Sequence, residues 1–164
     1  MNKITINVST GEVKVGKIKV ILKSTAIGSC IVIISYDMKN RIGGMAHIML
    51  PGRSPESTVF KNNKTRFAHD AIDELIRKLS HFGVKTNNLI TCLIGGANVL
   101  KKKENTIADN NISSVTEYLD KMKINITAKI LGGTSRRSAL FYIEEERISY
   151  TEGNSREKLL WQNK

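Results

Sequence analysis

Alternating polar and apolar residues fill the first part of the chain and predict short β-strands there. The apolar positions, most of them β-branched, fall in three segments, residues 4–8, 13–15 and 18–22. After a corner at residues 28–30, the β-branched run that opens residues 31–37 predicts a buried strand. We expect the chain to turn at residues 37–40 and to return beside that run as a partner strand over residues 41–50.

The rest of the chain switches between helical and strand periodicity. Apolar residues recur at three- and four-residue spacing over residues 67–82, before Gly83, and again over residues 112–122, which predicts two amphipathic helices. Polar residues 51–65 predict a mobile loop, and loops of that length are often functional. Strands are expected on the remaining apolar segments, residues 89–96, 124–130 and 139–150, the last as a hairpin or two short strands.

Together these elements predict a protein of the α/β class. Strands that follow one another in sequence favour mixed, mostly antiparallel sheets over a doubly wound parallel sheet. We therefore expect sandwich-like sheets flanked by two main helices. The 164 residues are a natural size for one compact domain and contain no low-complexity tract, so the prediction is a single domain over residues 1–164.

A net charge of +11, from 26 basic and 15 acidic residues, favours anionic partners. Nucleic acid is a poor candidate, because aromatic residues make up only 5% of the chain and the lysines do not interleave with them in a nucleic-acid-binding pattern. An acidic protein surface fits the charge as well. No apolar segment approaches the roughly 20 residues that span a bilayer, and the N-terminus has no signal-like run. We expect a cytoplasmic protein without membrane insertion.

Two cysteines, Cys30 and Cys92, are too few for a secreted disulfide framework. Cys92 is flanked by apolar residues on both sides and is expected to be a core residue. Cys30 instead lies at the edge of a buried strand, after Gly28, whose backbone freedom permits a sharp corner. Such a corner can present Ser29 and Cys30 at a surface, although a structural role for Cys30 taken alone stays open.

His47 strengthens the catalytic interpretation of Cys30. If the strands on either side form a hairpin centred near residue 38 or 39, paired residue numbers sum to about 77, which puts Cys30 opposite His47. A thiol beside an imidazole is the pair that a thiol nucleophile needs. A third group normally orients such an imidazole, and the hydroxyls of Ser24 and Thr25 are the nearby candidates.

Other site chemistries find little support in the sequence. His69 and His81 lie on the first predicted helix without a matching set of Cys, Asp or Glu, so no metal site is expected. The two Gly-Gly turns carry neither a Walker lysine nor a GxGxxG pattern, so we expect no phosphate cradle and no cofactor.

Several motifs together resemble the CheD family of chemoreceptor glutamine deamidases. STAIGSC at residues 24–30 and GGMAHIMLP at 43–51 are similar to the family's hydroxyl residue, LGSC motif and GGM-x-H-x-MLP motif. Further similar segments are RFAHDAIDEL at 66–75, LIGGANVL at 93–100, Asn111 and GGTSRRS at 132–138. The departures are Ser24 in place of the usual threonine, His69 in place of an acidic residue and Ala108 in place of a glycine.

The resemblance implies a cysteine hydrolase that converts glutamine side chains of chemoreceptor cytoplasmic domains to glutamate and releases ammonia. It implies Cys30 as the nucleophile, His47 as its base and Ser24 as the orienting hydroxyl, with Thr25 as the alternative. Backbone N–H groups around Gly28, Ser29 and Cys30 are the implied oxyanion donors. A CheC-type phosphatase is the implied second partner. The rival hypothesis is a regulator that binds such a phosphatase without deamidating receptors.

Overall fold

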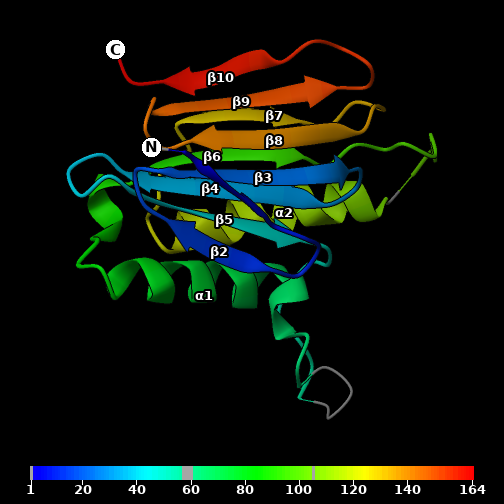
Figure 1. The fold of residues 1–164 in the computed structure, drawn as a ribbon. Helices are drawn as coiled ribbons and strands as arrows, with labels where there is room; N and C mark the ends of the chain where they lie inside the picture. Colours follow the sequence, from blue (N-terminus) through cyan, green and yellow to red (C-terminus); the bar gives the residue numbers. More distant parts are fainter. Residues whose placement is uncertain (1, 57–60, 105) are drawn as a thin grey trace.

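The computed structural model describes residues 2–56, 61–104 and 106–164. Its strands are β1 (Ile4–Asn7), β2 (Val13–Gly16), β3 (Val20–Ile27), β4 (Ile31–Asp37), β5 (Ile42–Ile48), β6 (Ile90–Gly95), β7 (Ala128–Leu131), β8 (Arg137–Tyr142), β9 (Arg147–Glu152) and β10 (Lys158–Gln162). The helices are α1 (Ala68–Ser80) and α2 (Ile107–Lys121), with short 3₁₀ turns η2 (Lys64–Arg66) and η3 (Thr86–Asn88). Two five-stranded sheets result, in the orders β1-β3-β8-β9-β10 and β2-β5-β4-β6-β7 (Figure 1).

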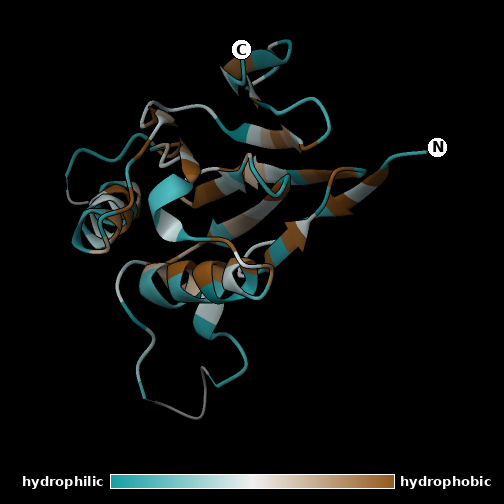
Figure 2. Cartoon of the chain, turned by 90° about the vertical axis from the view of Figure 1, so that its left-hand side faces the viewer, coloured by the Kyte–Doolittle hydropathy of each residue, from teal (hydrophilic) through white to brown (hydrophobic). Residues whose placement is uncertain are grey.

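The sheet that contains β4 is the middle of three layers. Ile31 and Ile33 of β4 belong to the core that α1 and α2 cover, whereas Val32, Ile34 and Tyr36 belong to the core between the two sheets. All seven residues of β4 are buried, because alternating side chains meet a packed layer on each face. Figure 2 shows both helices on one side of the sheets, and it shows many hydrophobic residues in the strands of the two sheets.

Two adjacent glycines let β5 pass between these layers. A Cβ atom on Gly43 would overlap the ring of Phe141 in the other sheet, and a Cβ atom on Gly44 would overlap Leu75 of α1. The β5 strand therefore lies close to both neighbours, and interiors this dense leave no room for an added methyl group.

The predicted fold class is confirmed: two mixed sheets pack together and two main helices flank them. The β1–β3 and β6–β7 pairs are parallel, and the other described pairs are antiparallel. Among the described residues, no helix has the length and apolarity needed to cross a membrane. Within the predicted loop at 51–65, residues 57–60 lie outside the described residues.

Two elements begin several residues from their predicted positions, and one strand was not predicted. The second helix begins at Ile107, before its apolar stripe, because the Thr106 side chain accepts a hydrogen bond from the Asp109 N–H (3.1 Å) and caps it. Strand β7 begins at Ala128 and not at Ile124. Ile124 instead belongs to the connection between α2 and β7, where its side chain packs into the core that the helices cover. Strand β10 was not predicted, since its residues are largely exposed and carry no clear alternation.

Candidate active site

Cys30 lies in the short connection between β3 of one sheet and β4 of the other. The connection between these two strands is at one end of the sandwich, on the right in Figure 1. Its thiol is partly buried and free, and it packs against the core between the sheets. Cys92 is also free, but it is fully buried in that core, and burial raises its pKa to about 12. The predicted difference between the two thiols is confirmed.

The predicted opposition of Cys30 and His47 is wrong by two residues. His47 pairs with Val32, so paired numbers in the β4–β5 hairpin sum to 79 and not to about 77. The turn is centred later because the Asp37 carboxylate accepts hydrogen bonds from the backbone N–H groups of Lys39 (2.9 Å) and Asn40 (3.4 Å). The ladder shows no bulge at the two glycines of β5.

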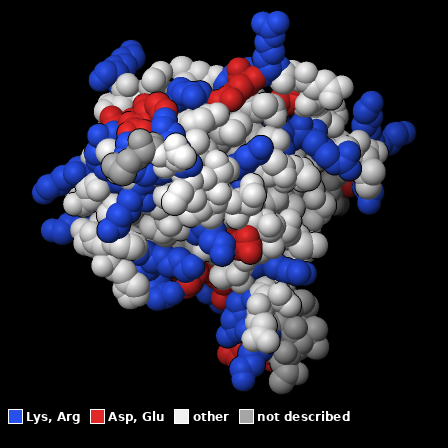
Figure 3. Space-filling view, in the orientation of Figure 1, with Lys and Arg blue, Asp and Glu red and all other residues white. Residues whose placement is uncertain are grey.

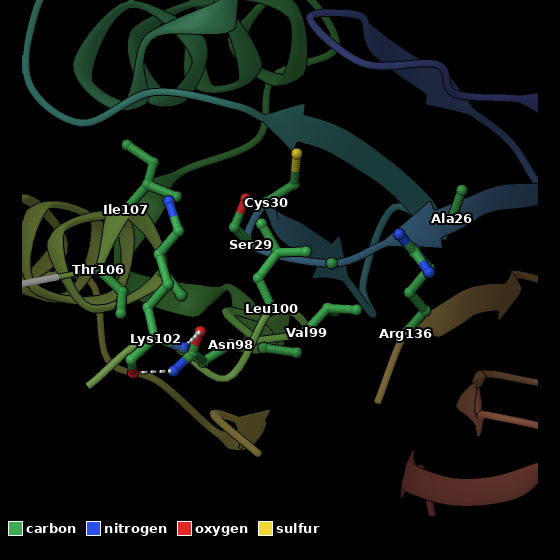
Figure 4. Close-up of a pocket in the computed structure, with 13 residues that line it drawn as sticks. Ala26, Ser29, Cys30, Asn98, Val99, Leu100, Lys102, Thr106, Ile107 and Arg136 are labelled. Atoms are coloured by element: carbon green, nitrogen blue, oxygen red, sulfur yellow. Dashed lines mark hydrogen bonds between the residues drawn. The ribbon is translucent and has the colours of Figure 1, made fainter. Parts of the chain in front are cut away.

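A shift of two residues leaves both side chains on the same face of the sheet, because side chains alternate with period two. Cys30 precedes Val32 by two residues and is thus the diagonal neighbour of His47, a relation that separates Cα atoms by roughly 7–8 Å. No hydrogen bond joins the two side chains in the described part of the chain, because His47 Nδ1 is bound to Ser24 and Nε2 has no partner. Figure 4 shows the Cys30 sulfur pointing toward the end of β5, the strand that carries His47.

Ser24 holds the His47 ring from the opposite sheet. The distance between Ser24 Oγ and His47 Nδ1 is 2.8 Å, and Ser24 Oγ donates its proton to the Val8 carbonyl at 2.6 Å. Since the hydroxyl has one proton, it accepts from Nδ1–H, which leaves His47 Nε2 unprotonated. Thr25 is exposed, and of the two candidate hydroxyls it is Ser24 that contacts the imidazole.

The unprotonated Nε2 of His47 is the basic atom of the site. It is buried and has no hydrogen-bond partner among the described residues. Burial lowers the pKa of His47, and it raises the pKa of the Cys30 thiol. A neutral imidazole and a neutral thiol are therefore the favoured resting forms, with proton transfer following the approach of a substrate.

Neighbouring segments bind all three carbonyl groups of the corner at residues 28–30. The N–H of Ala97 donates to Gly28 (2.8 Å), the Asn111 side-chain amide donates to Ser29 (2.9 Å), and the N–H of Gly96 donates to Cys30 (2.8 Å). In the described part of the chain, the backbone N–H groups of Gly28 and Ser29 have no hydrogen-bond partner. The corner is thus fixed through its carbonyls, with these N–H groups available to an anion.

Asn111 and Gly95 support this corner and were not identified as site residues from the sequence. The buried Asn111 amide also donates to the Met49 carbonyl (3.0 Å), so it joins the corner to the end of β5. Gly95 has φ +129°, and a Cβ atom there would overlap the Cys30 carbonyl. Arg137 Nη1 in turn donates to the Gly95 carbonyl at 3.1 Å. The available signal for Asn111 was a polar residue on the apolar face of α2, four residues before Val115.

A pocket of about 400 Å³ opens beside Cys30 (Figure 4). Its wall combines the corner with the segment between β6 and α2 and with Arg136; the lining residues are Ala26, Gly28, Ser29, Cys30, Ala97, Asn98, Val99, Leu100, Lys102, Thr106, Ile107, Ala108 and Arg136. A second, more polar hollow of about 480 Å³ is lined by His47. The thiol thus borders the first opening and the imidazole borders the second.

The other two histidines, His69 and His81, line neither opening. His69 stacks on Tyr118 with ring centroids 4.1 Å apart, and His81 is exposed beside Arg77. Within the described ranges, no group of three or more His, Cys, Asp or Glu side chains is arranged to hold a metal ion. The site therefore consists of a thiol, an imidazole, a hydroxyl and backbone N–H groups.

The fold and site define an α/β sandwich with a thiol and an imidazole on the same side of one sheet, and comparison with known proteins identifies the family. Residues 49–152 match the model of the CheD family, described as CheD chemotactic sensory transduction. A Chlorobium luteolum protein is 37% identical to this chain, over 93% of this chain and 75% of its own length. A Methanococcus maripaludis protein is 34% identical, over 91% of this chain and 96% of its own length. Both are named "probable chemoreceptor glutamine deamidase CheD".

This chain belongs to the CheD family, as its motifs indicated. A Clostridium botulinum protein with the same name is 37% identical to this chain, over 79% of this chain and 85% of its own length. The family-model match begins at Met49, after Cys30 and His47. The roles of those two residues therefore rest on their geometry.

Proposed function

We propose that this chain deamidates glutamine side chains of chemoreceptors, with Cys30 as the nucleophile and His47 as the base. The reaction class comes from the names of its relatives. The observation that carries the residue assignment is the Ser24–His47 hydrogen bond, which leaves a bare imidazole nitrogen on the face where the Cys30 sulfur lies.

The first half of the reaction forms a thioester. As the glutamine amide carbon approaches, His47 Nε2 takes the Cys30 proton and the sulfur attacks that carbon. The backbone N–H groups of Gly28 and Ser29 stabilise the oxyanion of the tetrahedral intermediate, where one donor contributes roughly 3 kcal/mol. The imidazolium returns its proton to the departing nitrogen, which leaves as ammonia.

The second half uses water. His47, neutral again, takes a proton from a water molecule that attacks the thioester carbonyl, and the same N–H groups hold the second oxyanion. The carbon–sulfur bond then breaks, the proton returns to Cys30, and the products are the glutamate side chain and free enzyme. Throughout both halves, Ser24 keeps the His47 ring in the tautomer that has a free Nε2.

Mass spectrometry of a receptor cytoplasmic fragment tests this proposal. The wild-type chain should convert specific amides to acids, and Cys30→Ala should lower the rate by about 10⁴-fold or more. Cys92→Ala is the matched control, because it removes the other thiol and leaves the site intact. A wild-type rate in Cys30→Ala, or its loss in Cys92→Ala, contradicts the assignment of the nucleophile.

The binding-only hypothesis makes the opposite prediction for the wild-type chain. It requires no mass change in the receptor fragment together with an intact complex with a CheC-type phosphatase. That partner stays a prediction from the family resemblance, and no observation favours the non-catalytic role over the deamidase.

A further inference from the structure

The pocket beside Cys30 has a rim that is both apolar and cationic. Leu100 is 76% exposed and Ile107 is 43% exposed, and both line the pocket. Lys102 and Arg136 supply the charge, and the described lining residues include no carboxylate. We call these four residues the docking rim. Figure 4 shows Lys102 and Arg136 on either side of Leu100, with Cys30 beyond it.

A hydrogen-bonded turn holds Leu100 in its exposed position. The Asn98 side chain donates to the Lys102 carbonyl (2.7 Å) and accepts from the Lys102 N–H (3.1 Å), and the Asn98 N–H donates to Gly133 (2.8 Å). Because the turn is fixed, a partner that covers Leu100 does not have to order a flexible loop first. A large apolar side chain presented in this way is typical of a protein-contact site.

The two cations of the docking rim are free to pair with a partner. Within the described ranges, neither Lys102 nor Arg136 has an ion pair, whereas the neighbouring Arg137 is bound to Glu152 at 2.9 Å. Lys and Arg also outnumber Asp and Glu on the face seen in Figure 3, in keeping with the net charge of +11. Unpaired cations beside a pocket favour a partner that carries carboxylates next to the side chain that enters the pocket.

We propose that the docking rim selects the substrate glutamine by its neighbours. Leu100 and Ile107 contact an apolar side chain next to the glutamine, while Lys102 and Arg136 pair with acidic side chains on the same segment. This inference rests on the proposed function and assigns its substrate preference. It predicts that glutamines in apolar, acidic segments react faster than glutamines in basic ones.

The experiment measures kcat/KM for deamidation of a receptor cytoplasmic fragment by charge-reversed variants. Lys102→Glu with Arg136→Glu should lower kcat/KM about tenfold, and raising the salt concentration should weaken the wild-type enzyme more than this variant. Lys85→Glu with Arg156→Glu is the matched control: both residues are exposed and unpaired within the described ranges, and the net charge changes equally. The control should stay within about twofold of wild type.

The apolar half of the rim has its own pair of variants. Leu100→Ser should lower kcat/KM about fivefold, whereas Leu159→Ser, at an exposed leucine of β10, should leave it unchanged. The rate of Cys30 alkylation by iodoacetamide should stay at the wild-type value in all these variants, because the thiol and the imidazole are untouched.

The outcomes separate this inference from the proposed function. If wild type deamidates the fragment and the rim variants match their controls, the docking rim is refuted and the deamidase stands. If wild type produces no mass change, the proposed function fails first. If charge reversal slows the alkylation of Cys30, the neutral double variant Lys102→Gln with Arg136→Gln tests the docking rim instead. This variant should lower kcat/KM while Cys30 is alkylated at the wild-type rate. A wild-type kcat/KM in this variant overturns the proposal.

Discussion

Ser24→Ala tests the part of the site on which the chemistry depends most directly. The substitution removes the hydroxyl that accepts from His47 Nδ1 at 2.8 Å and donates to the Val8 carbonyl at 2.6 Å. Both partners belong to buried residues, each 2% exposed. Leaving one buried polar group without a partner costs about 1–3 kcal/mol, and at the low end of that range two such groups cost about 2 kcal/mol of the free energy of unfolding.

A loss of that size leaves the protein folded and measurable. Domains of this length lose about 2–4 °C in Tm per kcal/mol, so Ser24→Ala should melt about 4–8 °C lower. The loss of activity should be larger than the loss of folded protein. Without the hydroxyl, the imidazole proton can move to Nε2 and the ring can rotate, which should lower kcat about 10- to 100-fold.

The assay is the rate of glutamine conversion in a receptor fragment, measured beside a thermal melt for each variant. Ser24→Thr keeps the hydroxyl and should retain most of the activity. Thr25→Ala removes the adjacent, exposed hydroxyl and should change neither quantity. A wild-type kcat in Ser24→Ala, or a larger loss in Thr25→Ala, would refute the idea that Ser24 sets the tautomer of His47.

Three further predictions follow from the same geometry. Burial lowers the pKa of His47, so the imidazole stays a base until the pH falls through that lowered pKa. The acid limb of the kcat/KM profile against pH should therefore lie below the ordinary histidine pKa of about 6.5. An acid limb above that value contradicts a neutral resting imidazole. Asn111→Ala leaves the Ser29 and Met49 carbonyls unpaired and should lower the free energy of unfolding in urea by about 2 kcal/mol, with slower deamidation; unchanged stability would remove Asn111 from the support of the corner. Gly95→Ala adds a Cβ atom that overlaps the Cys30 carbonyl at a φ of +129° and should slow iodoacetamide alkylation of Cys30 relative to Gly153→Ala, where nothing lies within 4 Å.

Hydrophobic periodicity was sufficient to predict most elements. The buried run of β4 and the amphipathic stripe of α1 are both where the pattern predicts them. A local pattern suffices in these cases because each element buries one continuous face or run of its own residues. The predicted register of the β4–β5 hairpin was wrong by two residues, but Cys30 and His47 still lie on one face of the sheet. Side chains alternate between the two faces, so a shift by an even number of residues does not change the face.

The choice between Ser24 and Thr25 is an intermediate case. Ser24 continues the alternation of Val20 and Leu22, which points toward the core, so the period alone favours it. The alternation ends there because β3 bulges between Ser24 and Ile27, with Ala26 at φ +54°. A pattern that stops at the residue in question cannot by itself decide which hydroxyl meets the imidazole.

The sequence by itself determined most of the strands and both main helices, the exceptional position of Cys30, and the family to which its motifs belong. Only the tertiary structure decided the contact of Ser24 with His47 across two sheets and the bonds of Asn111 to the corner and to β5. Those contacts join residues 23 to 82 positions apart, and they depend on how whole layers pack. Periodicity along the chain describes the face of each element, but it does not describe which distant side chain that face will meet.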